Sequence, residues 1–197
     1  MDMKTGKQNT STRLLQAAIN LISERGYNGV TTEEIATAAG LSEKTLFRYF
    51  GTKLNLLESS FDHFHYTEDM KKVFQEGLVW ELEADLLTIC SAYHEIMNRD
   101  RKLVMISLKE SALLPDFKKR MHQHPLQLLE VLKQYFIGMG ERGKIIRTDP
   151  ELQAFTFMMT HFGAFINDLD SGKHYPNIRL EPFMQESVRI FARALTP

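Results

Sequence analysis

The chain has 197 residues, of which 43% are hydrophobic, and its formal net charge is -1. This length allows one large or two small cores, since a domain typically takes about 100 to 200 residues. The near-neutral charge argues against proteins that bind nucleic acid through bulk positive potential, so any DNA binding must be local. A single cysteine, Cys90, excludes an intrachain disulfide. The first ten residues are polar and lack the apolar core of a secretory signal. The sequence contains no apolar run long enough to predict a membrane span. We therefore expect the protein in the cytoplasm.

Apolar residues recur at spacings of three and four from one end of the chain to the other, and no sustained period-two run interrupts them. The sequence therefore predicts an all-α fold. The first helix is expected at 11–25, where Gly26 can take the left-handed conformation that ends it.

Two short helices separated by a glycine are expected next, at 32–49. Thr31 can cap the amide of Glu34 while the Glu34 side chain reaches back, which is a capping box that starts the second helix. That helix stops at Gly40, and Ser42 can cap the third helix. The pattern is typical of a helix-turn-helix, whose second helix fits the major groove of DNA.

The third helix has one face for packing and one for DNA. Ser42 stands at its N-terminus, where the helix dipole favours a phosphate. The opposite face offers four side chains to DNA: Glu43, Lys44, Thr45 and Arg48.

Six further helices are expected beyond this element. The fourth runs from 53 to 74 and links the first module to the rest of the chain. The others are expected at 80–98, 100–113, 116–140 (with Pro125 as a candidate break), 150–169 and 179–195.

An ordered set of residues in the first quarter of the chain matches a known pattern: Gly26-Tyr27, Thr31-Thr32-x-x-Ile35-Ala36, Ala39-Gly40-Leu41-Ser42, Leu46-Phe47-x-Tyr49-Phe50 and Lys53. This set resembles the tetracycline-repressor (TetR) family of transcriptional regulators. The resemblance implies a DNA-binding domain at 1–52, followed by a larger helical domain at 53–197 that binds an inducer and dimerises. It also implies DNA contacts from eight residues: Thr32, Ser42, Lys44, Thr45, Phe47, Arg48, Tyr49 and Lys53.

The expected function is therefore that of a sequence-specific transcriptional regulator, a ligand-responsive repressor that acts as a homodimer on a palindromic double-stranded DNA operator. Two positions depart from the family pattern. Glu43 stands where a basic or small residue is common, although a carboxylate could accept from a cytosine amino group. Phe47 replaces a frequent tyrosine and lacks the hydroxyl that would bond to a phosphate. We read Tyr49 as a DNA contact and Phe50 as core.

Methionine and aromatic residues concentrate after the first module. Such residues are usually core, but adaptable methionine and aromatic walls also suit an apolar ligand, and the resemblance favours a pocket for a small apolar or amphipathic inducer. Mid-helix position indicates four candidate lining residues: Tyr93, Met105, Phe136 and Phe162.

The last two helices carry broad apolar faces with spacings of three and four. One face must be buried within the subunit, and the surplus suits a two-fold helical bundle with a second copy. The candidate interface residues are Phe155, Met159, Phe162, Ile166, Met184, Val188 and Phe191.

Two motifs resemble catalytic signatures without their context. The G-x-G-x-x-G at 138–143 lacks the strand that should precede a nucleotide loop, and His94-Glu95 begins a zinc-protease motif whose second histidine is missing. His161 is read as a satisfied core or interface histidine. We expect no metal, no cofactor and no enzyme activity. Two alternative functions stay open. One is a protein that binds DNA without sequence preference. The other is a helical protein that binds a small molecule, either as an enzyme or without regulatory coupling.

Overall fold

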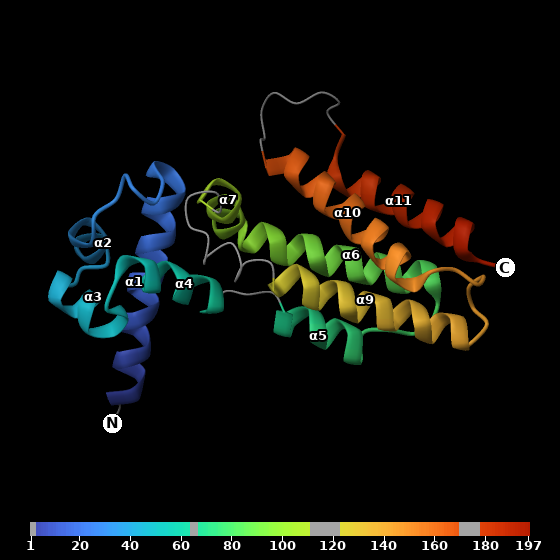
Figure 1. The fold of residues 1–197 in the computed structure, drawn as a ribbon, viewed down its shortest axis with the longest axis horizontal. Coiled ribbons are helices and arrows are strands. Elements are labelled where there is room, and N and C mark those ends of the chain that lie inside the picture. Colours follow the sequence, from blue (N-terminus) through green and yellow to red (C-terminus); the bar gives the residue numbers. More distant parts are fainter. Residues whose placement is uncertain (1–2, 64–66, 111–122, 170–177) are drawn as a thin grey trace. The chain divides into compact units, whose positions relative to one another are not determined.

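The computed structural model describes residues 3–63, 67–110, 123–169 and 178–197. Within these ranges it contains ten helices and no strand, which confirms the all-α prediction. The helices form two compact units (Figure 1). The first contains α1 (Met3–Arg25), α2 (Thr32–Ala38), α3 (Glu43–Phe50), α4 (Lys53–His63) and α7 (Arg101–Glu110). The second contains α5 (Thr67–Glu76), α6 (Leu82–Arg99), α9 (Gln123–Glu141), α10 (Pro150–Leu169) and α11 (Leu180–Leu195).

The helices depart from the predicted ones most clearly at α1, at the predicted helix 53–74 and at Pro125. Helix α1 begins at Met3, before the predicted start. The sequence did not predict this part because residues 3–10 lack the apolar periodicity by which a helix is recognised. They contain no proline, so nothing stops the helix from extending through them. The predicted helix 53–74 corresponds to α4 and α5, and its residues 64–66 lie outside the described ranges. Pro125 does not break α9, because it lies in the first turn, where a missing N–H costs no helical hydrogen bond. Residues 111–113 and 116–122 of the neighbouring predictions are also outside the described ranges.

The predicted signals around the first two turns are present. Gly26 and Gly40 have φ values of 76° and 65°, in the left-handed region that favours glycine. Thr31 Oγ1 accepts from the Glu34 amide at 3.2 Å, and the Thr31 amide donates to Glu34 Oε2 at 2.8 Å. The capping box therefore starts α2 at the predicted residue.

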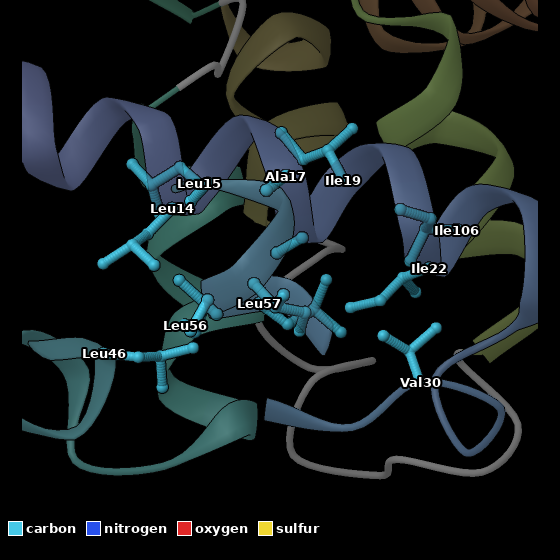
Figure 2. Packing of buried hydrophobic residues seen from close by; sticks show 14 of the residues in the cluster. Leu14, Leu15, Ala17, Ile19, Ile22, Val30, Leu46, Leu56, Leu57 and Ile106 are labelled. Atoms are coloured by element: carbon cyan, nitrogen blue, oxygen red, sulfur yellow. The ribbon is translucent and has the colours of Figure 1, made fainter. Parts of the chain in front are cut away.

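The first unit is built around one apolar cluster, part of which Figure 2 shows. Leu14 of α1, Leu46 of α3 and Leu56 of α4 are fully buried and point toward one another. Ile106 of α7 lies beside Ile22 of α1 in the same cluster, although the two are far apart in the sequence. Leu46 is the buried anchor of α3, so the orientation of that helix depends on this shared core.

The second unit is a bundle in which α10 packs on α9, α11 packs on α6, and α5 contacts both α6 and α9 (Figure 1). Its core includes the fully buried Phe136 and Phe165. A buried carboxylate, Asp85, accepts from the Val79 amide at 2.8 Å and from the Tyr135 hydroxyl at 3.0 Å, which satisfies both of its oxygens. No helix in the described ranges has the length and apolar character of a membrane span.

Candidate DNA-binding surface and buried cavity

Helix α3 presents one face to the core and the other to solvent. Leu46 is buried, whereas Lys44, Phe47 and Arg48 are exposed. Ser42 caps the helix, because its Oγ accepts from the Thr45 amide at 3.3 Å and lies 2.9 Å from the Thr45 hydroxyl. The exposed amides and basic side chains of α3 can therefore meet a negatively charged backbone and base edges together.

Two of the predicted DNA contacts bond to each other. The Thr32 hydroxyl donates to Glu43 Oε1 at 2.5 Å, which joins the first turn of α2 to the first turn of α3. This bond links the two helices of the motif and gives the Glu43 carboxylate a partner within the first unit. The two residues are 11 positions apart in the chain, and no local pattern indicated that their side chains meet.

The predicted contact Lys53 is engaged inside the first unit. Its ammonium donates to the carbonyls of Tyr27 and Val30, both at 2.8 Å, and lies 4.2 Å from the centre of the Tyr27 ring. Burial lowers the pKa of Lys53, while the nearby Glu110 carboxylate opposes this shift. Lys53 thus ties α4 to the turn between α1 and α2, and an ammonium with three donors keeps one more for another partner.

The two aromatic residues at the end of α3 lie in different surroundings. Phe50 packs against the apolar cluster of the first unit. Tyr49 is half-buried, and the Arg48 guanidinium lies 5.4 Å from the centre of its ring. Tyr49 can therefore position Arg48 as well as offer its own hydroxyl.

Two residues that support the motif were missed in the sequence analysis. Arg13 of α1 donates to the Ala39 carbonyl in the turn before α3. Glu110 of α7 is buried and accepts from the Tyr27 amide at 3.0 Å, across 83 positions of sequence. Periodicity identifies faces of single helices and cannot pair residues so far apart, so neither contact had a sequence signal.

The second unit contains a small cavity of about 10 Å³, which is room for roughly one water molecule. Its walls come from α5, α6, α9 and α10 and include Met70, Cys90, Tyr93, Leu132, Phe157, Met158 and His161. Of the four candidate ligand residues, Tyr93 lines this cavity. Phe136 is buried elsewhere in the bundle, Phe162 is half-buried, and Met105 lies on α7 in the first unit.

A pair of buried histidines stands at this cavity. His94 Nε2 and His161 Nδ1 are 3.2 Å apart, each residue is 2% exposed, and His161 is part of the cavity wall. His161 is a core histidine, as expected, but it is not fully satisfied, because within the described residues neither its Nε2 nor His94 Nδ1 has a hydrogen-bond partner. Leaving a buried polar atom unpaired costs about 1 to 3 kcal/mol, so the pair is retained at a cost to stability.

The histidine pair predicts an acid-sensitive fold. Burial lowers the pKa of His94 to about 4, opposed by Asp168, and lowers that of His161 to about 3, with a further contribution from His94. The unfolded chain takes up these protons near the ordinary pKa of about 6.5, so stability present above that pH is lost as the pH falls toward the folded values. From about pH 8 to about pH 5, the free energy of unfolding should fall by about 2 to 4 kcal/mol more than in the double variant His94→Phe with His161→Phe. Urea denaturation at fixed protein concentration measures both, and parallel pH profiles would contradict the expectation.

The candidate dimer residues do not share one environment. On α10, Phe155 and Met159 are 49% and 37% exposed, and Phe162 and Ile166 are half-buried. On α11, Val188 is buried within its own subunit, whereas Met184 and Phe191 are half-buried. Two exposed apolar residues were not among the candidates, Leu152 at 60% and Ile190 at 58%. An apolar stripe therefore follows α10 at spacings of three and four: Leu152, Phe155, Met159, Phe162 and Ile166.

The glycine motif set aside in the sequence analysis has an ordinary structural role. Helix α9 runs through Gly138 and Gly140, and Gly143 follows its end with a φ of 65°. No strand precedes this segment within the described ranges, so the glycines are parts of a helix and its C-terminal turn. Among the described residues, no group of three or more His, Cys, Asp or Glu side chains is placed to hold a metal ion.

Comparison with known proteins agrees with this architecture. Residues 14–59 match the family described as bacterial regulatory proteins of the tetR family. The chain is 31% identical over 188 residues to YvkB, an uncharacterized HTH-type transcriptional regulator of Bacillus subtilis, covering 95% of this chain and 97% of that protein. It is 27% identical to the HTH-type transcriptional repressor AcnR of Corynebacterium glutamicum, covering 87% and 89% of the two chains.

The same architecture is found among solved structures. The transcriptional regulator FadR from Bacillus subtilis, crystallised in complex with stearoyl-CoA, has a TM-score of 0.71 and 17% identity, covering 92% of this chain and 97% of that one. At this identity the likeness concerns the fold. Together with the full-length relative and the helix-turn-helix geometry, it leads to one conclusion: the chain belongs to the tetR family of bacterial regulatory proteins and is a sequence-specific DNA-binding transcriptional regulator.

Proposed function

We propose that this regulator is a ligand-responsive repressor that acts as a homodimer on a palindromic operator. The observation that carries the proposal is the two-sided character of α3, with Leu46 fully buried in the core while Lys44 and Arg48 are exposed on the opposite side. A helix held in this way can enter the major groove with its polar face toward the bases. The relative AcnR is named a repressor, which supports repression as the mode of action.

We assign the DNA contacts by chemistry. Lys44, Thr45 and Arg48 read base edges, because they project from the exposed face of α3. The backbone is contacted by Ser42 at the helix N-terminus and by the Tyr49 hydroxyl. Thr32, Glu43, Phe47 and Lys53 complete the set, with Thr32, Glu43 and Lys53 holding the motif in shape through the bonds described above.

The homodimer is supported by the apolar stripe on α10. An operator with two half-sites about one helical turn apart requires two readers related by a two-fold axis. The partly exposed side chains of the stripe provide a self-complementary apolar surface for a second copy. We assign the regulator to the cytoplasm, where it would meet its operator, and assign it no catalytic role.

The ligand response is supported by the path of the chain between the two units. Helix α6 carries the cavity residues Cys90 and Tyr93, and the chain passes from it directly into α7. At the end of α7, Glu110 holds the Tyr27 amide beside the α1–α2 turn. A ligand that shifts α6 can therefore change the geometry of the reader through α7. The structural relative FadR was crystallised with stearoyl-CoA, so this fold accommodates ligands.

Selection of genomic DNA by the purified full-length protein tests the proposal. We expect the bound fragments to share one inverted repeat, and footprinting to protect both halves with two protomers bound. Recovery of fragments with no common sequence, at affinities that depend only on salt, would instead identify a non-specific DNA-binding protein.

A further inference from the structure

The cavity has apolar walls and lies against His161, a histidine that carries an unpartnered polar atom. Met70, Leu132, Phe157 and Met158 contribute hydrocarbon, thioether and aromatic surface. His161 Nε2 has no hydrogen-bond partner in the part of the chain that the structure describes, and the residue is 2% exposed. A buried polar atom of this kind has an unused capacity for one hydrogen bond.

The histidine pair can offer either sense of hydrogen bond. If His94 Nε2 donates to His161 Nδ1, then His161 carries its other proton on Nε2 and that atom is a donor. If His161 Nδ1 donates to His94 Nε2, then His161 Nε2 is an acceptor, and the remaining proton lies on His94 Nδ1. Exchange of both tautomers therefore switches His161 Nε2 between donor and acceptor without a change in charge.

The surroundings disfavour a charged ligand. Among the described residues that line the cavity there is no Lys, Arg, Asp or Glu, and burial lowers the pKa of both histidines, against the opposing effect of Asp168 on His94, which keeps the pair neutral at pH 7. An anion here would be buried without a counter-charge, which is strongly unfavourable. A pure hydrocarbon would leave His161 Nε2 unpaired, so the best fit is a neutral molecule with one polar group.

We infer that this cavity is the contracted form of a ligand site for an uncharged, mainly apolar molecule that carries one hydroxyl or carbonyl group, bound to His161 Nε2. The inference rests on the proposed ligand-responsive function. With room for roughly one water molecule, the cavity must open to admit such a ligand. Met70 and Met158 are unbranched and can change rotamer, so they are the walls that move.

A matched set of three probes tests the class of ligand on the full-length protein without DNA. Para-ethylphenol, para-ethyltoluene and para-ethylbenzoate share one apolar body and differ in carrying a hydroxyl, a methyl or a carboxylate. We expect para-ethylphenol to bind about 5- to 10-fold more tightly than para-ethyltoluene, the worth of one hydrogen bond, and para-ethylbenzoate to bind least. Nitrogen NMR of the wild-type histidine rings should show a shift at His161 Nε2 with para-ethylphenol alone.

Variants locate the effect. His161→Phe should remove the preference for para-ethylphenol over para-ethyltoluene, while His63→Phe, the same change on α4 of the first unit, should retain it. Equal affinity for the phenol and the toluene, tighter binding of the benzoate, or an unchanged His161 resonance would overturn the inference. The NMR measurement decides the question even if His161→Phe does not fold.

Operator titrations separate this inference from the proposed function. If para-ethylphenol binds at His161 but leaves operator affinity unchanged, the ligand site stands and the regulatory coupling fails. If the phenol shows no preference while DNA selection yields one inverted repeat, the DNA-reading function stands and the assignment of this cavity fails.

Discussion

Replacing Phe155 and Met159 together with glutamate is expected to convert the regulator into a monomer that binds its operator at least about 100-fold more weakly. Both side chains lie on the apolar stripe of α10 and are 49% and 37% exposed in the single chain. Full burial of such a side chain contributes about 1.5 to 3 kcal/mol, and part of that gain is still available at each position in both copies. The four glutamates would also repel one another and lose hydration across a two-fold interface.

Sedimentation measures the mass of this variant, and fluorescence anisotropy with the selected operator measures its affinity. The matched control is Leu126→Glu with Leu87→Glu, which adds the same two charges at positions on α9 and α6 that are 63% and 37% exposed. This control should remain dimeric and bind DNA normally. A dimeric Phe155→Glu, Met159→Glu protein would place the interface on another surface.

Local signals in the sequence predicted the elements of the DNA-binding motif almost residue by residue. The capping box at Thr31 and Glu34, the left-handed glycines and the Ser42 cap each involve residues within a few positions of one another. Such interactions depend on local backbone geometry, so they can be read from the order of residues alone. The resemblance to the tetR family added the functional meaning of the set.

Contacts between distant residues could not be predicted in the same way. The bond from Tyr27 to Glu110 and the pairing of His94 with His161 join helices that are far apart in the chain. Each of these residues looks ordinary within its own helix, and the partner is decided by tertiary packing. The choice of candidate ligand residues by mid-helix position shows the same limit. It selected Tyr93, which lines the cavity, but also Met105, which lies on a helix of the other unit.

The periodicity of the last helices predicted apolar faces but not which side of each face is buried. Val188 and Met159 both satisfy the spacing rule, yet Val188 is 1% exposed and Met159 is 37% exposed. A helix with apolar residues on more than one side gives no internal criterion for the choice. The exposed fraction in the folded chain is therefore what divides the candidate interface into core residues and residues available to a second copy.

Removing the two basic side chains of α3 is the most direct test of DNA reading. In the double variant Lys44→Ala with Arg48→Ala, the affinity for the selected operator should fall by about 2 to 6 kcal/mol, since each good base contact is worth about 1 to 3 kcal/mol. Both side chains are exposed, and the core anchor Leu46 is untouched, so the fold should persist. Fluorescence anisotropy at one fixed salt concentration gives the affinity, and circular dichroism checks the fold.

The control must remove the same charge from another surface. Lys72→Ala with Arg147→Ala also removes one lysine and one arginine, both exposed and both in the second unit. If bulk charge dominated, the two variants would weaken operator binding equally. If Lys44 and Arg48 contacted only phosphates, their removal would weaken operator and unrelated DNA to the same extent. Base reading predicts a third result, in which the α3 variant loses far more affinity for the operator than for unrelated DNA, because only the operator presents the base edges that those two side chains recognise.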